Sequence, residues 1–163
     1  MIDESQFVSE ITDMKDMLYR LSVSYLHRDA DAQDAVQQAL ENAWRHRARI
    51  DVQGFRPWMT RIVINECKSM LRRRKWCFPS GQAETLGGQM PPPDVTLADA
   101  LERMPEKLRT PLLLHYMEDF TVQEIALALG VPRTTVVNRL HRARRALREA
   151  LDEREESSCA TRK

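Results

Sequence analysis

The chain has 163 residues, of which 42% are hydrophobic and 30% are charged, a balance typical of a folded protein and not of a disordered one. This length is enough for one domain or for two small helical ones. The net charge of only +1 conceals an asymmetry, because acidic residues concentrate near the N-terminus and at 152–156, whereas basic residues concentrate at 68–75 and at 133–148. Two basic stretches on a nearly neutral chain suggest local contact with nucleic acid.

Hydrophobic periodicity predicts three helices in the first half of the chain, over residues 5–27, 31–48 and 56–76. We expect Asp29 or Asp31 to cap the second helix. The residues expected to face inward recur at spacings of three and four; in the first helix they are Phe7, Ile11, Met14, Leu18, Leu21 and Tyr25, in the second Ala35, Val36, Leu40, Ala43 and Trp44, and in the third Met59, Ile62, Val63, Met70 and Leu71.

Residues 78–94 interrupt every periodicity and are rich in proline and glycine, so they are predicted to be a linker. A short helix is expected after Thr96, carrying Leu97, Leu101 and Met104. The next segment starts at Pro105, and Pro111 inside it predicts a kink or a helix that begins near Arg109.

Residues 120–151 are predicted to form a helix, a tight turn and a second helix. Thr121 and Glu124 form a capping box, and Gly130 stands where the backbone needs a positive φ. The second helix keeps four apolar residues on one face, Val136, Leu140, Ala143 and Leu147. Arginines cover its other faces, and no acidic residue occurs between Arg133 and Arg148. This pattern is typical of a helix-turn-helix that inserts a basic helix into the major groove of DNA.

The sequence shows no pattern of cysteine pairing, metal binding or membrane insertion. Cys67, Cys77 and Cys159 show no metal-ligand spacing, so neither a disulfide framework nor a zinc site is predicted. The first residues lack an apolar signal core, and no apolar run is long enough to cross a bilayer. We expect a cytoplasmic protein without direct membrane insertion, without a metal and without a cofactor.

Four stretches together, 18–26, 31–44, 55–75 and 120–151, resemble a bacterial RNA polymerase sigma factor of the extracytoplasmic-function (ECF) group of the sigma-70 family. The resemblance implies an all-α fold with two modules, a region 2-like module at 5–77 and a region 4-like module at 95–152, joined by the linker at 78–94. It implies a promoter-specificity subunit that is not an enzyme.

For the first module, the resemblance implies two interfaces. The helix at 31–44 would dock on the β′ clamp helices of core RNA polymerase through Asp34, Gln37, Gln38 and Asn42. Gln38 and Ala39 replace the Glu-Thr pair common in the family. The segment 55–75 would melt and read the promoter −10 element through Arg61, Asn65, Ser69, Arg72 and Arg73, with the loop 50–55 shaping a pocket for a flipped base. Trp58 is expected in the core.

For the second module, the resemblance implies that the last helix reads duplex −35 DNA through Arg133, Val137, Asn138, Arg139, His141 and Arg142. Val137 departs from the family, which usually has Lys or Arg there; valine can contact a thymine methyl but cannot donate a hydrogen bond. Asn138 replaces the usual Ser and could pair with adenine.

The implied partners are core RNA polymerase, through the β′ clamp helices and the β flap, promoter DNA, and an anti-sigma factor that is often membrane-anchored in this family. Two other functions would account for part of the sequence. A conventional helix-turn-helix regulator would explain residues 96–151 but leave 18–76 without a role. An enzyme with a DNA-binding tail would need a metal-spaced carboxylate cluster, a phosphate-binding loop or an activated nucleophile, and none of these patterns occurs in the sequence.

Overall fold

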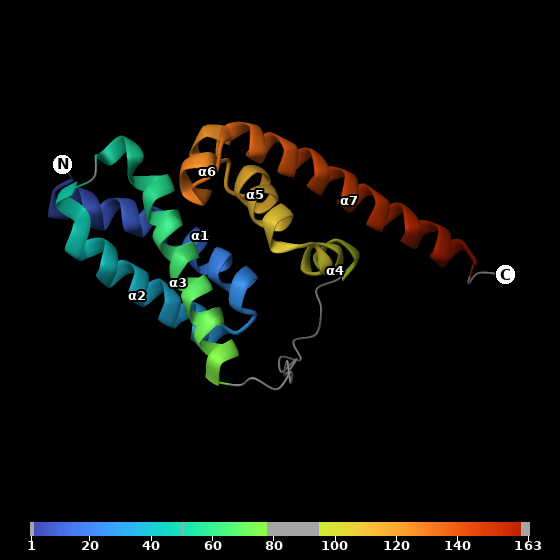
Figure 1. Ribbon diagram of the computed structural model, residues 1–163, viewed down its shortest axis with the longest axis horizontal. Coiled ribbons are helices and arrows are strands. Elements are labelled where there is room, and N and C mark those ends of the chain that lie inside the picture. Colours follow the sequence, from blue (N-terminus) through green and yellow to red (C-terminus); the bar gives the residue numbers. More distant parts are fainter. Residues whose placement is uncertain (1, 50, 78–94, 161–163) are drawn as a thin grey trace. The chain divides into compact units, whose positions relative to one another are not determined.

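A computed structural model of the chain describes residues 2–49, 51–77 and 95–160. These residues form seven α-helices and two 3₁₀ turns, and no strand occurs among them, so the predicted all-α fold is confirmed. The chain divides into two compact units, one holding α1, α2 and α3, and the other holding α4, α5, α7 and the start of α6 (Figure 1). Within the described residues, no helix is both long enough and apolar enough to cross a membrane.

The first helix, α1 (Glu4–Leu26), has well-defined ends. At its start, the Asp3 carboxylate accepts from the Gln6 amide at 2.8 Å and the Gln6 side chain accepts from the Asp3 amide at 3.2 Å, which satisfies two free N–H groups. At its end, His27 takes a left-handed φ of 56° and its amide donates to the Val23 carbonyl at 2.8 Å. The predicted helix at 5–27 is confirmed.

The second helix, α2 (Asp29–His46), begins two residues earlier than predicted, and the predicted caps are wrong. The N-cap residue is Arg28, and no side chain caps the helix. Asp29 instead accepts a hydrogen bond from the Tyr19 hydroxyl; this bond, then desolvation of the hydroxyl and the Asp29 charge, raise the pKa of Tyr19. Asp31 pairs with Arg74 and lies 3.8 Å from Arg28. Both carboxylates therefore make tertiary contacts. Residue preferences at the start of a helix consider only neighbouring positions and cannot predict such contacts.

Two 3₁₀ turns, η1 (Arg47–Arg49) and η2 (Val52–Gly54), connect α2 to α3 (Phe55–Cys77). The helices α1, α2 and α3 pack against one another in pairs. Aromatic rings close one end of this core, because the Phe7 ring lies edge-on to Trp44 at 5.3 Å and to Phe55 at 5.4 Å between centroids. Such pairs add specific geometry to apolar burial.

The buried face of α2 consists of four alanines at spacings of three and four, Ala32, Ala35, Ala39 and Ala43, each 0% exposed. Two of them were predicted. Val36, Leu40 and Trp44, also predicted to face inward, are only half-buried. Small side chains let neighbouring helices approach closely, so the larger residues lie at the margins of the contact.

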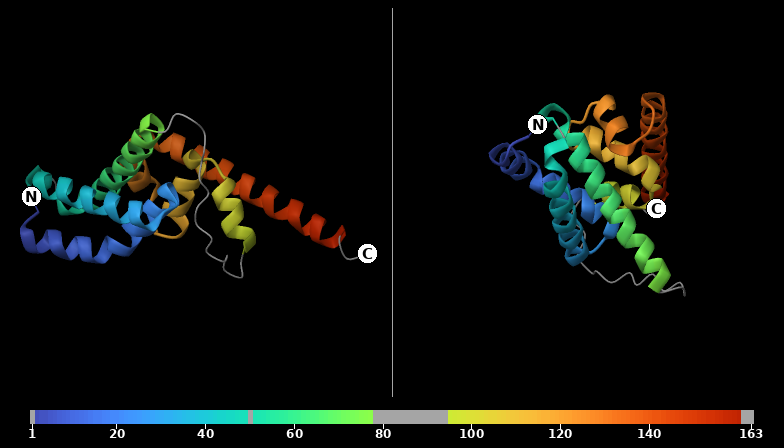
Figure 2. Two further views of the ribbon diagram at one scale, coloured as in Figure 1. Left: turned by 90° about the horizontal axis from the view of Figure 1, so that it is seen from below. Right: turned by 60° about the vertical axis from the view of Figure 1, so that its left-hand side comes forward.

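The second unit contains α4 (Val95–Arg103), α5 (Glu106–Tyr116), α7 (Arg133–Ala160) and the start of α6 (Val122–Leu129). Its core contains Met104, Leu112 and Ala143, with Leu101, Leu108, Ala146 and Leu147 packed around them. Figures 1 and 2 show that α7 continues past α4 and α5 toward the C-terminus. The predicted start of a helix near Arg109 is wrong, because α5 begins at Glu106 and runs through Pro111. Proline there removes one helical hydrogen bond, and the burial of Pro111, Leu112 and Leu114 offsets that loss.

The predicted helix-turn-helix is present. The Thr121 amide donates to the Glu124 carboxylate at 2.8 Å, and the Glu124 amide donates to the Thr121 hydroxyl at 3.2 Å. Gly130 has a φ of 64°, and the Val131 amide closes the end of α6 on the Ala126 carbonyl at 3.1 Å. The Pro132 carbonyl then accepts from Thr135 at 3.0 Å as α7 begins. The predicted linker at 78–94 lies outside the described residues.

Candidate functional site

The outer face of α2 carries the four residues expected to contact polymerase. Asp34, Gln37, Gln38 and Asn42 are all exposed, while the alanine face of the same helix is fully buried. Three of them, Asp34, Gln38 and Asn42, follow one line at a spacing of four. The fold therefore presents these polar groups to solvent on a helix that is rigidly held from behind.

The C-terminal end of α2 is fixed by Trp44 and Arg47. The Arg47 guanidinium lies 3.8 Å over the Trp44 ring and donates to the Trp44 carbonyl at 2.9 Å. A cation over an indole face is attracted by the ring quadrupole. This arrangement defines how the chain leaves α2 and enters η1.

One face of α3 carries the residues expected to contact the −10 element. Arg61, Asn65 and Arg72 are exposed and Ser69 is half-buried. The opposite face contains Met59, Val63 and Cys67, all 0% exposed. Asn65 lies between two cationic positions on this face, where its amide can both donate and accept hydrogen bonds.

The arginines at the C-terminal end of α3 differ in whether they have an acidic partner. Arg73, a predicted DNA contact, donates to the Glu66 carboxylate at 3.0 Å and to the Ser69 hydroxyl at 3.2 Å. Glu66 is only 15% exposed at its side chain, whereas Arg73 is 67% exposed. Arg74 pairs with Asp31. Two consecutive arginines therefore have acidic partners inside the protein, and Arg72 remains an exposed cation.

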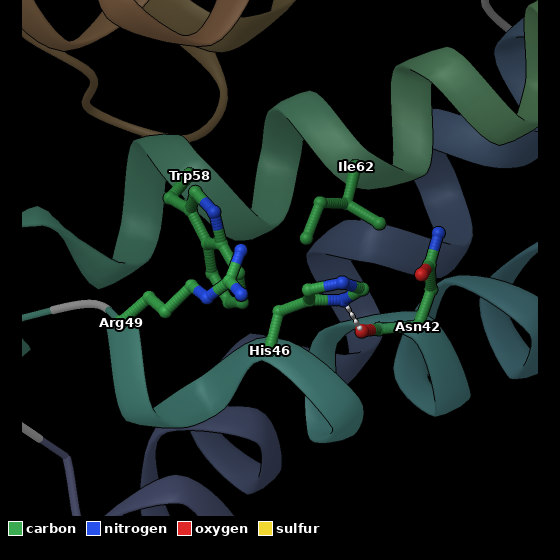
Figure 3. Close-up of a pocket in the computed structure, with 5 residues that line it drawn as sticks. All are labelled: Asn42, His46, Arg49, Trp58 and Ile62. Atoms are coloured by element: carbon green, nitrogen blue, oxygen red, sulfur yellow. Dashed lines mark hydrogen bonds between the residues drawn. The ribbon is translucent and has the colours of Figure 1, made fainter.

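A pocket of about 340 Å³ lies where α2 ends and α3 begins, lined by Asn42, His46, Arg49, Trp58 and Ile62. Figure 3 shows Trp58 and Ile62 reaching into it from α3, and Asn42, His46 and Arg49 from α2 and η1. Trp58 was expected in the core, but it is half-buried: its ring packs at 5.8 Å from Phe55 and also lines the pocket.

Sequence reasoning missed His46 and Arg49, and it placed Asn42 only on the polymerase face. The loop at 50–55 was expected to shape a pocket, yet the lining residues that the structure describes lie just before and after that loop. Helical spacing could have predicted the position of His46. It lies four residues after Asn42 and is the last residue of α2, so it continues the exposed face of that helix.

The second unit presents α7, the helix expected to read −35 DNA. Of the six residues expected to contact −35 DNA, Arg139 is half-buried and the others are exposed. Val137 is 52% exposed, whereas its neighbour Val136 is 0% exposed. Across the residues that the structure describes, no carboxylate pairs with Arg133, Arg139 or Arg142.

Farther along α7, Arg144 and Arg145 have intramolecular partners. Arg145 donates to Glu149 at 2.8 Å, and this hydrogen bond and the nearby negative charge raise the pKa of Arg145. The Arg144 guanidinium lies 5.9 Å from the Tyr116 ring centroid. The cations without acidic partners therefore concentrate in the N-terminal half of α7, next to the turn.

Comparison with known proteins matches both units. Residues 11–77 match the model of the family described as sigma-70 region 2, and residues 94–147 match that described as sigma-70, region 4. The RNA polymerase sigma factor SigV of Bacillus subtilis (strain 168) is 30% identical, over 86% of this chain and 88% of that protein. The ECF RNA polymerase sigma factor SigM of Mycobacterium tuberculosis (strain Erdman) is 32% identical, over 83% of this chain and 76% of that protein.

Solved structures show the same fold. The sigma factor RpoE of Bartonella quintana, solved with the anti-sigma factor NepR, aligns with a TM-score of 0.76 at 21% identity, over 90% of this chain and 96% of that one. Three findings point to the same family: the two matched regions occur in the order 2 then 4, the relatives are sigma factors, and an exposed basic helix follows a tight turn. The chain belongs to the ECF group of the sigma-70 family and is a promoter-specificity subunit of bacterial RNA polymerase.

Proposed function

We propose that the two modules divide promoter recognition between them. The module at 5–77 docks on core polymerase and holds the melted −10 element. The module at 95–152 reads the −35 element as duplex DNA, and residues 78–94 link the two. The observation that carries this proposal is that the exposed polar face of α2, the cationic face of α3 and the uncompensated arginines of α7 lie on separate helices.

The polymerase contact is assigned to Asp34, Gln37, Gln38 and Asn42 on α2, facing the β′ clamp helices. Their exposure supports this role, and so does the rigid backing of α2 by its buried alanines. A preorganised helix face loses little conformational entropy when it binds. The second module is assigned the β flap as its own polymerase contact.

The −10 contact is assigned to Arg61, Asn65, Ser69, Arg72 and Arg73 on α3. Binding single-stranded DNA requires cations along the backbone and planes or pockets for unstacked bases. The exposed arginines supply the first, and the pocket beside Trp58 supplies the second. Arg73 would reach a phosphate only by leaving Glu66, so its contribution is smaller than that of Arg72.

The −35 contact is assigned to the N-terminal half of α7. Arg133, Arg139 and Arg142 bind phosphates, while Asn138 and His141 offer hydrogen bonds to base edges. Val137 is exposed on the same helix and contributes only an apolar contact. This favours a −35 sequence with a thymine methyl opposite Val137.

We assign the protein to the cytoplasm, without catalytic activity of its own, and regulated by an anti-sigma factor. Two similar solved structures support the regulatory partner, since their titles describe RpoE with the anti-sigma factor NepR and CnrH with the cytosolic domain of CnrY. An anti-sigma factor would act by covering the faces assigned to polymerase and DNA.

Run-off transcription from a pool of promoters, with core polymerase alone and with this protein added, tests the proposal. Specific initiation only when both are present is the expected result, and the selected promoters would define the −10 and −35 sequences. Tight binding of the protein alone to duplex DNA, without initiation, would instead favour a conventional helix-turn-helix regulator.

A further inference from the structure

Two acid–arginine pairs near the C-terminal end of α3 differ in what they connect. Arg73 donates to Glu66 at 3.0 Å, and both residues belong to α3. Arg74 pairs with Asp31, which lies in the first turn of α2, 43 positions away in sequence. The first pair therefore stays within one helix, whereas the second joins the helix assigned to −10 DNA to the helix assigned to polymerase.

The basic end of α3 has little apolar burial to hold it in place. Cys67 is the last α3 residue that is 0% exposed among those the structure describes, and every residue from 68 to 75 is half-buried or exposed. A helix end without buried side chains opens locally at a low cost in free energy. Contacts made by polar side chains therefore matter more at this end than in the middle of the helix.

The pair of Asp31 and Arg74 is well placed to hold this end. The Asp31 side chain is only 19% exposed and that of Arg74 38%, so the pair is screened less than a fully exposed one. The start of α2 is also held from α1, because Asp29 accepts a hydrogen bond from the Tyr19 hydroxyl. Figure 1 shows the last turns of α3 beside the start of α2. The pair thus ties the end of α3 to a well-held part of the three-helix core.

Arg28 is a second cation near the same carboxylate, but it joins no second helix. It lies 3.8 Å from Asp31, is 59% exposed and is the N-cap residue of α2. An exposed pair of residues three positions apart contributes little to stability. Loss of Arg28 would leave the contact between α2 and α3 intact, which makes Arg28 a matched control for Arg74.

We infer that Asp31 and Arg74 are positioning residues for the −10 element, an inference that rests on the function proposed above. Their pair keeps Arg72 and Arg73 at fixed positions along α3, and Arg74 itself makes no contact with the strand. Arg72 and Arg73 directly precede Arg74 and are exposed. Cations that are already held in place lose less conformational freedom on binding a strand than cations on a frayed helix end.

A positioning role reverses the usual effect of removing an acidic residue. Loss of a carboxylate near a DNA-binding surface normally strengthens DNA binding, because it removes a charge that repels phosphates. Glu66→Gln should act in this way by releasing Arg73. Asp31→Ala should instead weaken binding, because it loosens the end of α3. The opposite signs distinguish a positioning residue from a simple electrostatic one.

The test measures the affinity of the full chain, bound to core polymerase, for a single-stranded −10 oligonucleotide with the sequence of a selected promoter. Asp31→Ala and Arg74→Ala should each lower the affinity by about fivefold, and the double variant by about the same factor, since either change breaks the same pair. Arg74→Lys should stay within about twofold of the unaltered protein, because its ammonium can still pair with Asp31. Core binding, measured by pull-down, should be unchanged in all of them.

Three controls separate positioning from a loss of charge. Arg28→Ala removes the exposed arginine beside Asp31, and Asp16→Ala removes an exposed carboxylate from α1; each should change the affinity by less than about twofold. In a protein that already carries Arg72→Ala and Arg73→Ala, the further change Asp31→Ala should have no effect, because the pair acts through these two arginines.

Stronger binding with Asp31→Ala would overturn the inference, because it would mean that Asp31 only withholds Arg74 from DNA. A loss of about 25-fold in the double variant would also overturn it, since that result indicates two independent contacts. A parallel loss of core binding would do the same by indicating general damage to the fold. In these cases the proposed function stands, because the unaltered protein still binds the oligonucleotide. No affinity of the unaltered holoenzyme for it would overturn the proposed function itself.

Discussion

Three neighbouring arginines at the C-terminal end of α3 have different surroundings. Arg72 is exposed, Arg73 is held by Glu66 and Ser69, and Arg74 pairs with Asp31. A guanidinium that already has a carboxylate partner gains less from a phosphate, because it must give up the first contact. Position along the helix therefore decides which of these charges is available to DNA.

This difference predicts distinct salt dependences. Arg72→Ala should lower the slope of log affinity against log salt by about 0.7 for a single-stranded −10 segment bound to the holoenzyme, the value for one lost phosphate contact. Arg73→Ala should lower it by less, and Glu66→Gln, which releases Arg73, should strengthen binding. Titration at several salt concentrations measures all three. Equal slopes for Arg72→Ala and Arg73→Ala would contradict the assignment.

Asn65 should act after polymerase binding. Its exposed side chain lies on the face of α3 to which we assign the −10 contact, and not on α2. Asn65→Ala should therefore slow open-complex formation by about tenfold and leave core binding unchanged. Gln37→Ala is the reciprocal control, expected to weaken core binding. Permanganate reactivity of melted thymines and a pull-down with core polymerase measure the two effects. Equal losses in both assays would exclude the role assigned to Asn65.

Val137 should set part of the −35 preference. It is 52% exposed on the recognition helix but cannot donate a hydrogen bond, so Val137→Lys should shift the preferred base toward guanine at one −35 position. A promoter library transcribed with each protein measures the shift. Thr134→Ala, at another exposed position in the first turn of α7, should leave the preference unchanged. An identical profile for Val137→Lys would mean that Val137 does not face the bases.

At the scale of elements, the features that sequence reasoning predicted well depend on residues close together in the chain. The capping box of Thr121 and Glu124 spans three residues, and the positive φ of Gly130 is a local requirement of the turn. The buried faces of α1 and α7 follow from helical periodicity. On α3, Met59 and Val63 are buried as predicted, whereas Ile62, Met70 and Leu71 are only half-buried. Exposure of most candidate residues could be predicted without a structure; Ser69 and Arg139, which are half-buried, are the exceptions.

The features that sequence reasoning missed depend on distant residues. Asp31 and Arg74 are 43 positions apart, and the pocket combines α2, η1 and the start of α3. No local rule brings His46 and Arg49 together with Trp58. The same limit explains the error at Pro111, where burial within the second unit outweighs a local preference against helix.

The cap of α6 gives a prediction at this scale. Thr121→Ala removes the hydroxyl that accepts from the Glu124 amide and should reduce the free energy of unfolding of the second unit by about 1 kcal/mol. Thr121→Ser should restore most of it, because serine retains the hydroxyl. Thermal unfolding followed by circular dichroism measures both. A Thr121→Ala protein as stable as the unaltered chain would show that the cap contributes nothing.

For the whole molecule, the arrangement into two units explains how modest contacts can give promoter selectivity. Each unit has its own core, and each offers only a few groups to DNA. When both are bound to one polymerase, engagement of the first element raises the effective concentration of the second unit at its own element. Selectivity then depends on the length of residues 78–94 as well as on base contacts.

Changing that length should have asymmetric effects on a promoter with both elements. Adding eight Gly/Ser residues lengthens the 17-residue segment 78–94 by about half and should lower initiation by only about twofold, since effective concentration falls roughly as the −3/2 power of length. Deleting eight residues reduces the maximum reach to about 30 Å and should lower initiation by more than about tenfold. A promoter without a −35 element should respond to neither change, and equal effects of insertion and deletion on the two-element promoter would mean that the units do not bind both elements at once.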